Sequence, residues 1–238
     1  VRASGRCEGL TGQQGHLNMP TVDLNALEGE GTAGGDDAIT FYRANEQPFG
    51  VFSNLYRRQV TVEERSYPTA DHAYQSLKPR DPRVRDWLMA APTPSLVALA
   101  AHVLPSEADS VEIMGRTADA LLGFHTRPGW SRLRFPWMLQ CLRAKFAQHQ
   151  DLRELLLSTG ARQIVEAGRI DDDAGRRWGV VNGRGKNYLG RMLMRVRAEL
   201  AGATCSDPDL DQRLSAGAEA LRTALAGMVP SDEQLASG

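Results

Sequence analysis

The chain has 238 residues, of which 42% are hydrophobic and 24% charged, and this composition is typical of a soluble globular protein with one domain and extensions. No apolar run approaches the roughly 18 residues of a membrane-spanning helix, and no basic segment followed by an apolar one opens the chain, so neither a membrane protein nor a secretory signal is expected. The cysteines Cys7, Cys141 and Cys205 are odd in number and widely spaced, which argues against a disulfide framework and a cysteine zinc site and favours the reducing cytoplasm.

Positive charge is concentrated in the middle of the chain. Residues 39–201 have 24 basic and 17 acidic side chains, whereas residues 1–38 and residues 202–238 each have two basic and six acidic ones. A basic domain between acidic extensions favours an anionic ligand, although an arginine-rich solvated surface has the same composition. Only three of the 28 basic residues are lysines, which hints that a compact ammonium group is needed at those positions.

The predicted elements, taken in chain order, divide the chain into three parts. Residues 1–38 are rich in glycine and have no lasting hydrophobic period, so they are predicted to be disordered. Residues 39–201 are predicted to form one α+β domain, richer in helix than in strand, because strands and helices do not alternate regularly. Residues 202–238 are predicted to be an extension with one amphipathic helix, which packs on the domain or on a partner.

The bounds of these elements are expected from hydrophobic periods and from the positions of proline and glycine. Strands are expected at 39–43, 59–62, 163–167 and 177–181. Helices are expected at 68–78, 83–90, 95–103, 106–122, 136–148, 152–158 and 187–200. The final amphipathic helix has its apolar side chains at Leu210, Leu214, Leu221, Leu225 and Met228.

The segment YPTADHAYQSLK, residues 67–78, carries the densest group of chemically useful side chains. A helix places Asp71, Tyr74, Gln75 and Lys78 on one face, because the last three lie three, four and seven positions after Asp71. An acid, a phenol, an amide and an ammonium group on one face indicate the edge of a functional groove. The alternative is an exposed stripe with an ion pair.

Two further segments and one tryptophan suit ligand binding. Ser53 and Asn54, which follow a glycine turn, offer small donors to a sugar or a phosphate, or else bond locally to the backbone. Residues 166–187 hold Glu166, a run of aspartates and a glycine-containing loop that leads into a helix, an arrangement typical of an anion cradle. Trp130, predicted in a loop, could stack on a base or be partly buried.

Taken together, the segments FYR, FSNL, YPTADHAYQSLK, KF, LLLSTG, VEA, WG and GKNYLG resemble the NADAR, or YbiA-like, family, from Phe41 to about Arg197. The resemblance implies a compact, mainly helical domain with a small β-sheet, and N-glycosidase chemistry on ribosylated bases. Members similar to this chain cleave phosphoribosylated amino-pyrimidine intermediates of riboflavin synthesis, and others remove ADP-ribose from guanine bases. No metal and no other cofactor is implied.

The matched positions receive roles from this resemblance. Asp71 is assigned to water activation or to stabilisation of an oxocarbenium-like ribose, Lys78 keeps its carboxylate ionised or holds substrate, and Asp173 is the second acid, with Asp172 as the alternative. The family usually has Glu where this chain has Asp71, and its acid three residues before the WG pair is replaced here by Gly175. The residues expected to bind substrate are Arg43, Ser53, Asn54, Tyr74, Gln75, Trp130, Trp178, Lys186 and Asn187.

The expected function is therefore hydrolysis of a phosphoribosylated amino-pyrimidine to ribose 5-phosphate and the free base. The expected partner is a small anionic substrate, with no membrane and with the oligomeric state left open. Removal of ADP-ribose from guanine in nucleotides or nucleic acid is one alternative, and a non-catalytic module that binds ADP-ribose or a nucleotide is another. Nucleic acid is less favoured as a partner, because the acidic extensions repel a long polyanion.

Overall fold

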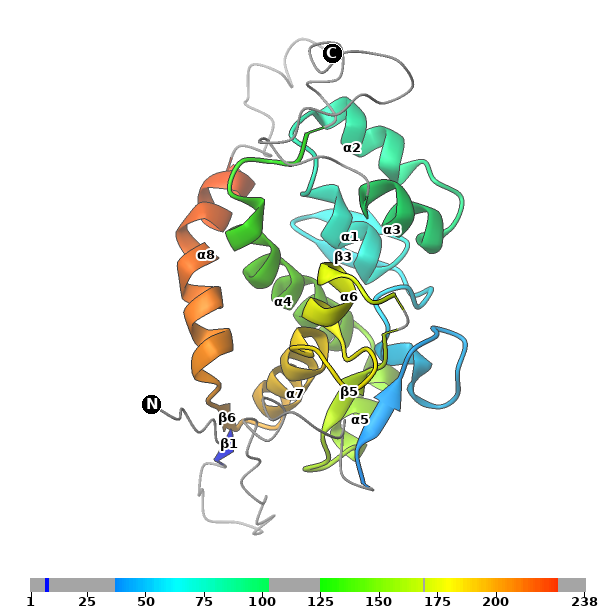
Figure 1. Cartoon of the computed structure of the whole chain (residues 1–238), viewed down its shortest axis with the longest axis vertical. Helices are drawn as coiled ribbons and strands as arrows, with labels where there is room; N and C mark the ends of the chain where they lie inside the picture. The colour runs from blue at the N-terminus through cyan, green and yellow to red at the C-terminus, as the bar shows by residue number, and fades with distance from the viewer. Residues whose placement is uncertain (1–6, 9–36, 103–124, 169, 227–238) are drawn as a thin grey trace.

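The computed structural model describes residues 7–8, 37–102, 125–168 and 170–226 (Figure 1). The predicted helix at 106–122 and nearly all of the segment predicted to be disordered lie outside these residues. The α-helices are α1 (Ala70–Ser76), α2 (Pro82–Met89), α3 (Pro94–His102), α4 (Trp130–Gln148), α5 (Gln150–Ser158), α6 (Asp173–Trp178), α7 (Tyr188–Leu200) and α8 (Pro208–Ala226). The strands are β1 (Cys7–Glu8), β2 (Ile39–Phe41), β3 (Val60–Val62), β4 (Arg65–Tyr67), β5 (Ile164–Glu166) and β6 (Thr204–Cys205), and a short 3-10 helix, η2, covers Phe49–Phe52. The predicted α+β class is confirmed.

The strands described pair two by two. β2 and β5 are parallel, with Phe41 opposite Glu166, so two segments far apart in the sequence end side by side. β3 and β4 form an antiparallel hairpin. The sequence predicts its first strand, at 59–62, but not its second. The segment expected as a strand at 177–181 is different, because its first residues close helix α6 and only isolated bridges follow.

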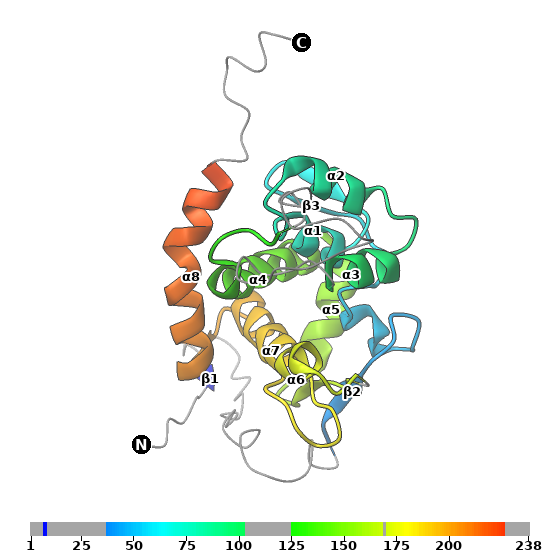
Figure 2. The ribbon, with the colours of Figure 1, turned by 45° about the horizontal axis from the view of Figure 1, so that its top comes forward.

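Helix α4 lies in the middle of the molecule and contacts α1, α5, α7, α8 and β3 (Figure 2). Its buried residues occupy more than one side of the helix, among them Trp137, Leu142 and Phe146. A helix that is buried on several sides belongs to the core. The helix begins at Trp130, six residues before the predicted start, because Pro136 lies inside it rather than in its first turn. The prediction that Trp130 lies in a loop is therefore wrong.

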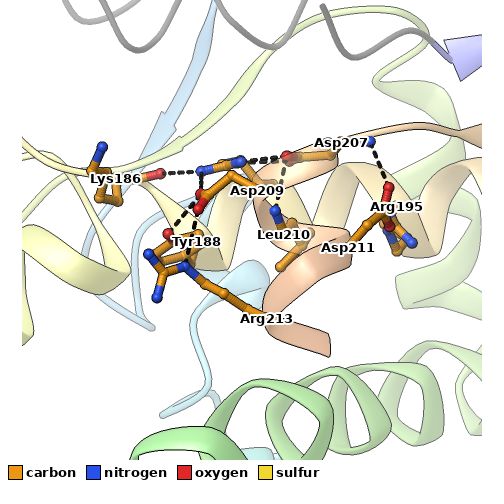
Figure 3. A network of polar contacts seen from close by, with 9 residues as sticks. Lys186, Tyr188, Arg195, Asp207, Asp209, Leu210, Asp211 and Arg213 are labelled. Carbon is orange, nitrogen blue, oxygen red and sulfur yellow. Dashed lines mark hydrogen bonds and ion pairs between the residues drawn. The ribbon is translucent and has the colours of Figure 1, made fainter. Parts of the chain in front are cut away.

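Helix α8 packs along α4 and is held to α7 by a network of ion pairs (Figures 1 and 3). The Arg191 guanidinium on α7 donates to Asp207 and, from Nη1 at 3.0 Å, to Asp209, which also accepts from the Tyr188 hydroxyl at 2.6 Å. Arg191 and Asp207 are both almost fully buried. Glycine at position 217 allows close packing, since a Cβ there would lie 2.3 Å from the carbonyl oxygen of Arg132 on α4. The sequence predicts that this helix packs either on the domain or on a partner, and the structure shows that it packs on the domain.

Replacing Arg191 by Met is expected to lower the free energy of unfolding by about 3–5 kcal/mol, because the carboxylate of Asp207 stays buried without its partner. Denaturant unfolding followed by circular dichroism measures this loss. The control is Arg222→Met on α8, whose ion pair with Glu219 is exposed, and it should cost about 0–1 kcal/mol. Equal losses in the two variants would show that the buried pair does not hold α8 in place.

The cysteines differ from the sequence-based expectation. Cys205 is disulfide-bonded, and its Cα partner across the β1–β6 pair is Cys7. The wide separation of the cysteines in the sequence argues against a disulfide framework, but an antiparallel strand pair brings residue 7 next to residue 205. Cys141 is free and buried in α4. No helix in the described residues has both the length and the apolar character needed to cross a membrane.

Candidate functional site

A pocket of about 900 Å³ lies between the segment that follows β2, helix α1, the start of α3 and the end of β5. We call it the carboxylate pocket, because both Asp71 and Glu166 line it. The other polar and aromatic residues that line it are Tyr42, Arg43, Asn45, Gln47, Ser53, Asn54, Tyr56, Arg57, Tyr74, Gln75, Thr93, Ser95 and Trp178.

Helix α1 is fixed so that Asp71 and Gln75 face this pocket. The Thr69 hydroxyl accepts a hydrogen bond from the His72 amide at 3.1 Å, so the helix begins after Thr69. The Asp71 amide donates to the carbonyl oxygen of Asn54 at 3.1 Å. Gln75, one turn later, donates from Nε2 to Oδ1 of Asp71 at 3.3 Å. The helix therefore presents its first carboxylate with a donor already beside it.

The backbone around Ser53 is held in place by Lys145 of α4. The Lys145 ammonium donates to the carbonyl oxygens of Val51 and, at 2.9 Å, of Ser53. Its side chain is fully buried, and this burial lowers its pKa to about 7. Asn54 then reaches the pocket and donates from Nδ2 to the Met138 sulfur at 3.2 Å. Lys145 is thus a positioning residue, which its rarity in the sequence hinted at without assigning it a role.

Glu166 is the last residue of strand β5. The contacts of its backbone explain why a glycine stands at position 179 and an asparagine at position 187. Its amide donates to Oδ1 of Asn187 at 3.0 Å, and its carbonyl accepts from the Val180 amide at 2.8 Å. A Cβ at Gly179 would lie 2.5 Å from that same carbonyl, so the WG pair needs its glycine. Asn187 also donates to the carbonyl of Ile164 at 2.9 Å. The helix start predicted as an anion cradle instead holds the strand that carries Glu166.

Burial raises the pKa of both carboxyl groups to about 7. At Asp71 the hydrogen bond from Gln75 and the charge of Lys78 oppose this rise, whereas at Glu166 the charge of Asp71 adds to it. The surroundings of Asp71 therefore favour its ionised form, and those of Glu166 favour its protonated form. Two carboxyl groups with these properties can act as a base and an acid at neutral pH.

Four buried oxygen atoms of the pocket accept no hydrogen bond from any described residue. They belong to residues that line the pocket on three different segments: Asn54 Oδ1, Asp71 Oδ2, Gln75 Oε1 and Glu166 Oε2. A buried acceptor without a donor costs free energy, so such oxygens are expected to receive hydrogen bonds from water or from a bound ligand. The pocket is therefore suited to a ligand with several hydroxyl or amino groups, such as a ribose.

Aromatic rings form one wall of the pocket. The ring of Tyr74 lies 5.2 Å from that of Trp130 and 5.7 Å from that of Trp178, measured between centroids. Trp178 also packs against Phe135 at 5.7 Å. Trp178 lines the carboxylate pocket, whereas Trp130 does not and instead lines a second pocket. Of the two tryptophans, Trp178 is the one placed to meet a base.

The structure brings most of the predicted site residues to the carboxylate pocket. These are Arg43, Ser53, Asn54, Asp71, Tyr74, Gln75 and Trp178. It places Lys78, Trp130 and Asp173 at the second pocket, together with Asp172. Lys186 is exposed and Asn187 is fully buried, and neither lines these pockets. In the described part of the chain, no three histidine, cysteine, aspartate or glutamate side chains gather into a group that could hold a metal ion.

Comparison with known proteins gives consistent matches. The model of the NADAR domain matches residues 40–201. N-glycosidase YbiA of Shigella flexneri is 34% identical over 167 residues, which are 70% of this chain and 90% of that protein. The riboflavin biosynthesis protein PYRR of Zea mays is 28% identical over 203 residues, which are 82% of this chain and 30% of that protein. The NMR structure of YbiA from E. coli superimposes with a TM-score of 0.54 at 28% identity and covers 76% of this chain and 94% of that one.

Proposed function

The chain belongs to the NADAR family and is an N-glycosidase, and we propose that its substrate is a phosphoribosylated amino-pyrimidine, from which it releases ribose 5-phosphate. The relative named for riboflavin biosynthesis supports this class of substrate. The observation that carries the proposal is the pair of buried carboxyl groups, Asp71 and Glu166, which line one pocket with pKa values of about 7.

Asp71 acts as the base in this mechanism. The bond between C1′ of the ribose and the nitrogen of the base breaks, and C1′ acquires positive charge that a nearby carboxylate stabilises. A water molecule then bonds to C1′ and gives a proton to Asp71. The amide of Gln75 orients the carboxylate, and the charge of Lys78 favours its ionised form.

Glu166 acts as the acid. It is protonated while Asp71 is ionised, and it gives its proton to the departing nitrogen, so the free base leaves without a negative charge. One turnover therefore exchanges the proton between the two carboxyl groups, and solvent restores the starting state. The ring of Trp178 stacks on the base, and the hydroxyl groups of the ribose donate to the unpaired oxygens of Asn54 and Gln75.

Release of product tests the proposed function. Purified full chain is incubated with the phosphoribosylated amino-pyrimidine, and separately with a guanine nucleotide or DNA that carries ADP-ribose. We expect ribose 5-phosphate from the first substrate and no more than trace ADP-ribose from the second. ADP-ribose as the main product would assign the enzyme to guanine bases instead. Binding without release from either substrate would contradict the proposed activity and leave a binding module.

A further inference from the structure

A second pocket, of about 670 Å³, lies on the other side of Tyr74 from the carboxylate pocket. We call it the basic pocket, because four cationic side chains line it, namely Lys78, Arg127, Arg134 and Arg177. The acids that line it are Asp172 and Asp173. Its cations come from four separate segments: the turn after α1, the segment before α4, α4 itself and α6.

The two acids of the basic pocket do not neutralise its arginines. Asp172 is engaged by the amide of Gly175 at 2.7 Å and by His102 at 3.6 Å, and Asp173 is exposed to solvent. The guanidinium groups of Arg134 and Arg177 make no hydrogen bond or ion pair with any residue in the described ranges. Both arginines are half-buried, and cations in a pocket without a partner among these residues favour the binding of an anion there.

The atom that shows this most directly is Nε of Arg134, which is buried and has no acceptor among the described residues. Burial lowers the pKa of Lys78 to about 8, and the charges of Arg134 and Arg177 contribute to this decrease. Three cations thus repel one another inside one pocket. An anion with more than one negative charge would relieve this repulsion, and a phosphate monoester has that charge and the oxygens to accept from several guanidinium groups.

Tyr74 lines the carboxylate pocket and contacts Trp130, which lines the basic pocket. Its ring contacts both Trp130 of the basic pocket and Trp178 of the carboxylate pocket, and the charges of both Asp71 and Arg134 act on its hydroxyl. Neighbouring residues of α6 divide in the same way, since Trp178 lines one pocket and Arg177 the other. The two pockets are therefore neighbours on either side of this aromatic group.

We propose that the basic pocket is the phosphate subsite, in which Arg134 and Arg177, with Lys78, hold the phosphate on C5′ of the ribose while C1′ faces Asp71 and Glu166. This inference rests on the proposed function and assigns its substrate an essential 5′-phosphate. Ribose 5-phosphate and ADP-ribose share a phosphate at this position, so either source would fit the same chemistry.

Binding measured by calorimetry on the full chain tests this subsite without requiring catalysis. We expect ribose 5-phosphate to bind more tightly than ribose, and Arg134→Gln and Arg177→Gln each to weaken its binding about tenfold to hundredfold. Arg132→Gln, an exposed arginine of the same helix α4, is the matched control and should bind like the wild type. A circular dichroism spectrum checks that each variant is folded. If Arg134→Gln does not fold, the result for Arg177→Gln decides the test, because Arg177 is partly exposed.

Wild-type affinity in both glutamine variants, or equal affinities of the wild type for ribose and ribose 5-phosphate, would overturn the phosphate subsite. ADP-ribose that binds more tightly than ribose 5-phosphate and loses affinity in the same variants would support the subsite and assign a diphosphate as its source. Failure of the proposed function gives a different result, namely binding of ribose 5-phosphate without any release of product.

Discussion

Replacing Asp71 by Asn is expected to lower kcat/KM for release of ribose 5-phosphate by about 10²–10⁴-fold. The amide has the shape of the carboxyl group but can neither take the proton of water nor stabilise positive charge at C1′. Its surroundings remain, because Gln75 and the Asn54 carbonyl contact groups that the substitution leaves in place. Steady-state kinetics over a range of substrate concentrations measure the loss, which should fall mainly on kcat.

Two further variants separate charge from structure at this position. Asp86→Asn removes one exposed carboxylate from α2 and should leave kcat/KM unchanged. Asp71→Glu restores the carboxylate and the residue that is usual in the family, so it should retain more activity than Asp71→Asn. A chain in which Asn and Glu at position 71 are equally inactive would indicate that packing, and not a carboxylate, matters there.

Replacing Glu166 by Gln is expected to lower kcat/KM by about 10²–10⁴-fold, because the departing base no longer receives a proton. The loss should be largest at acidic and neutral pH, where the wild-type carboxyl group is protonated. The matched control is Glu154→Gln on the exposed side of α5, which should behave like the wild type.

The pH dependence of kcat/KM assigns the two carboxyl groups. Because Asp71 must be ionised and Glu166 protonated, the wild-type rate should fall both below and above a maximum near pH 7. Glu166→Gln should remove the fall on the alkaline side, and Asp71→Asn the fall on the acidic side. The reverse pattern would exchange the two roles, and an unchanged profile in both variants would place the titrating groups elsewhere.

The sequence predicts one half of the carboxylate pocket well. Helical spacing in residues 67–78 places Asp71, Tyr74 and Gln75 on one face, and these side chains do line the pocket. The prediction needs only local geometry, since the three residues lie within a single short helix. Lys78 differs because α1 ends at Ser76, so its side chain follows the turn beyond the helix and reaches the basic pocket.

The other half depends on contacts that no local pattern contains. Glu166 lies in the pocket because β5 pairs with β2 in parallel, a register between segments far apart in the chain. A count back from the WG pair predicts Asp173 as the second acid instead. The residues between form helix α6, and a helical turn carries Asp173 round to the basic pocket. A residue count along the chain cannot predict this change of direction.

Helix α8 lies outside the region that matches the family in sequence but inside the packed core of the structure. The match to the family model ends at residue 201, but the apolar core continues into α8. Leu210 and Leu221 complete the apolar interior, and Asp207 neutralises a guanidinium that lies inside it. A chain shortened to residues 40–201 would therefore expose the apolar side of α4 and leave the buried guanidinium of Arg191 without its partner. Relatives that lack an equivalent of α8 must cover α4 and balance the charge at the position of Arg191 by other means.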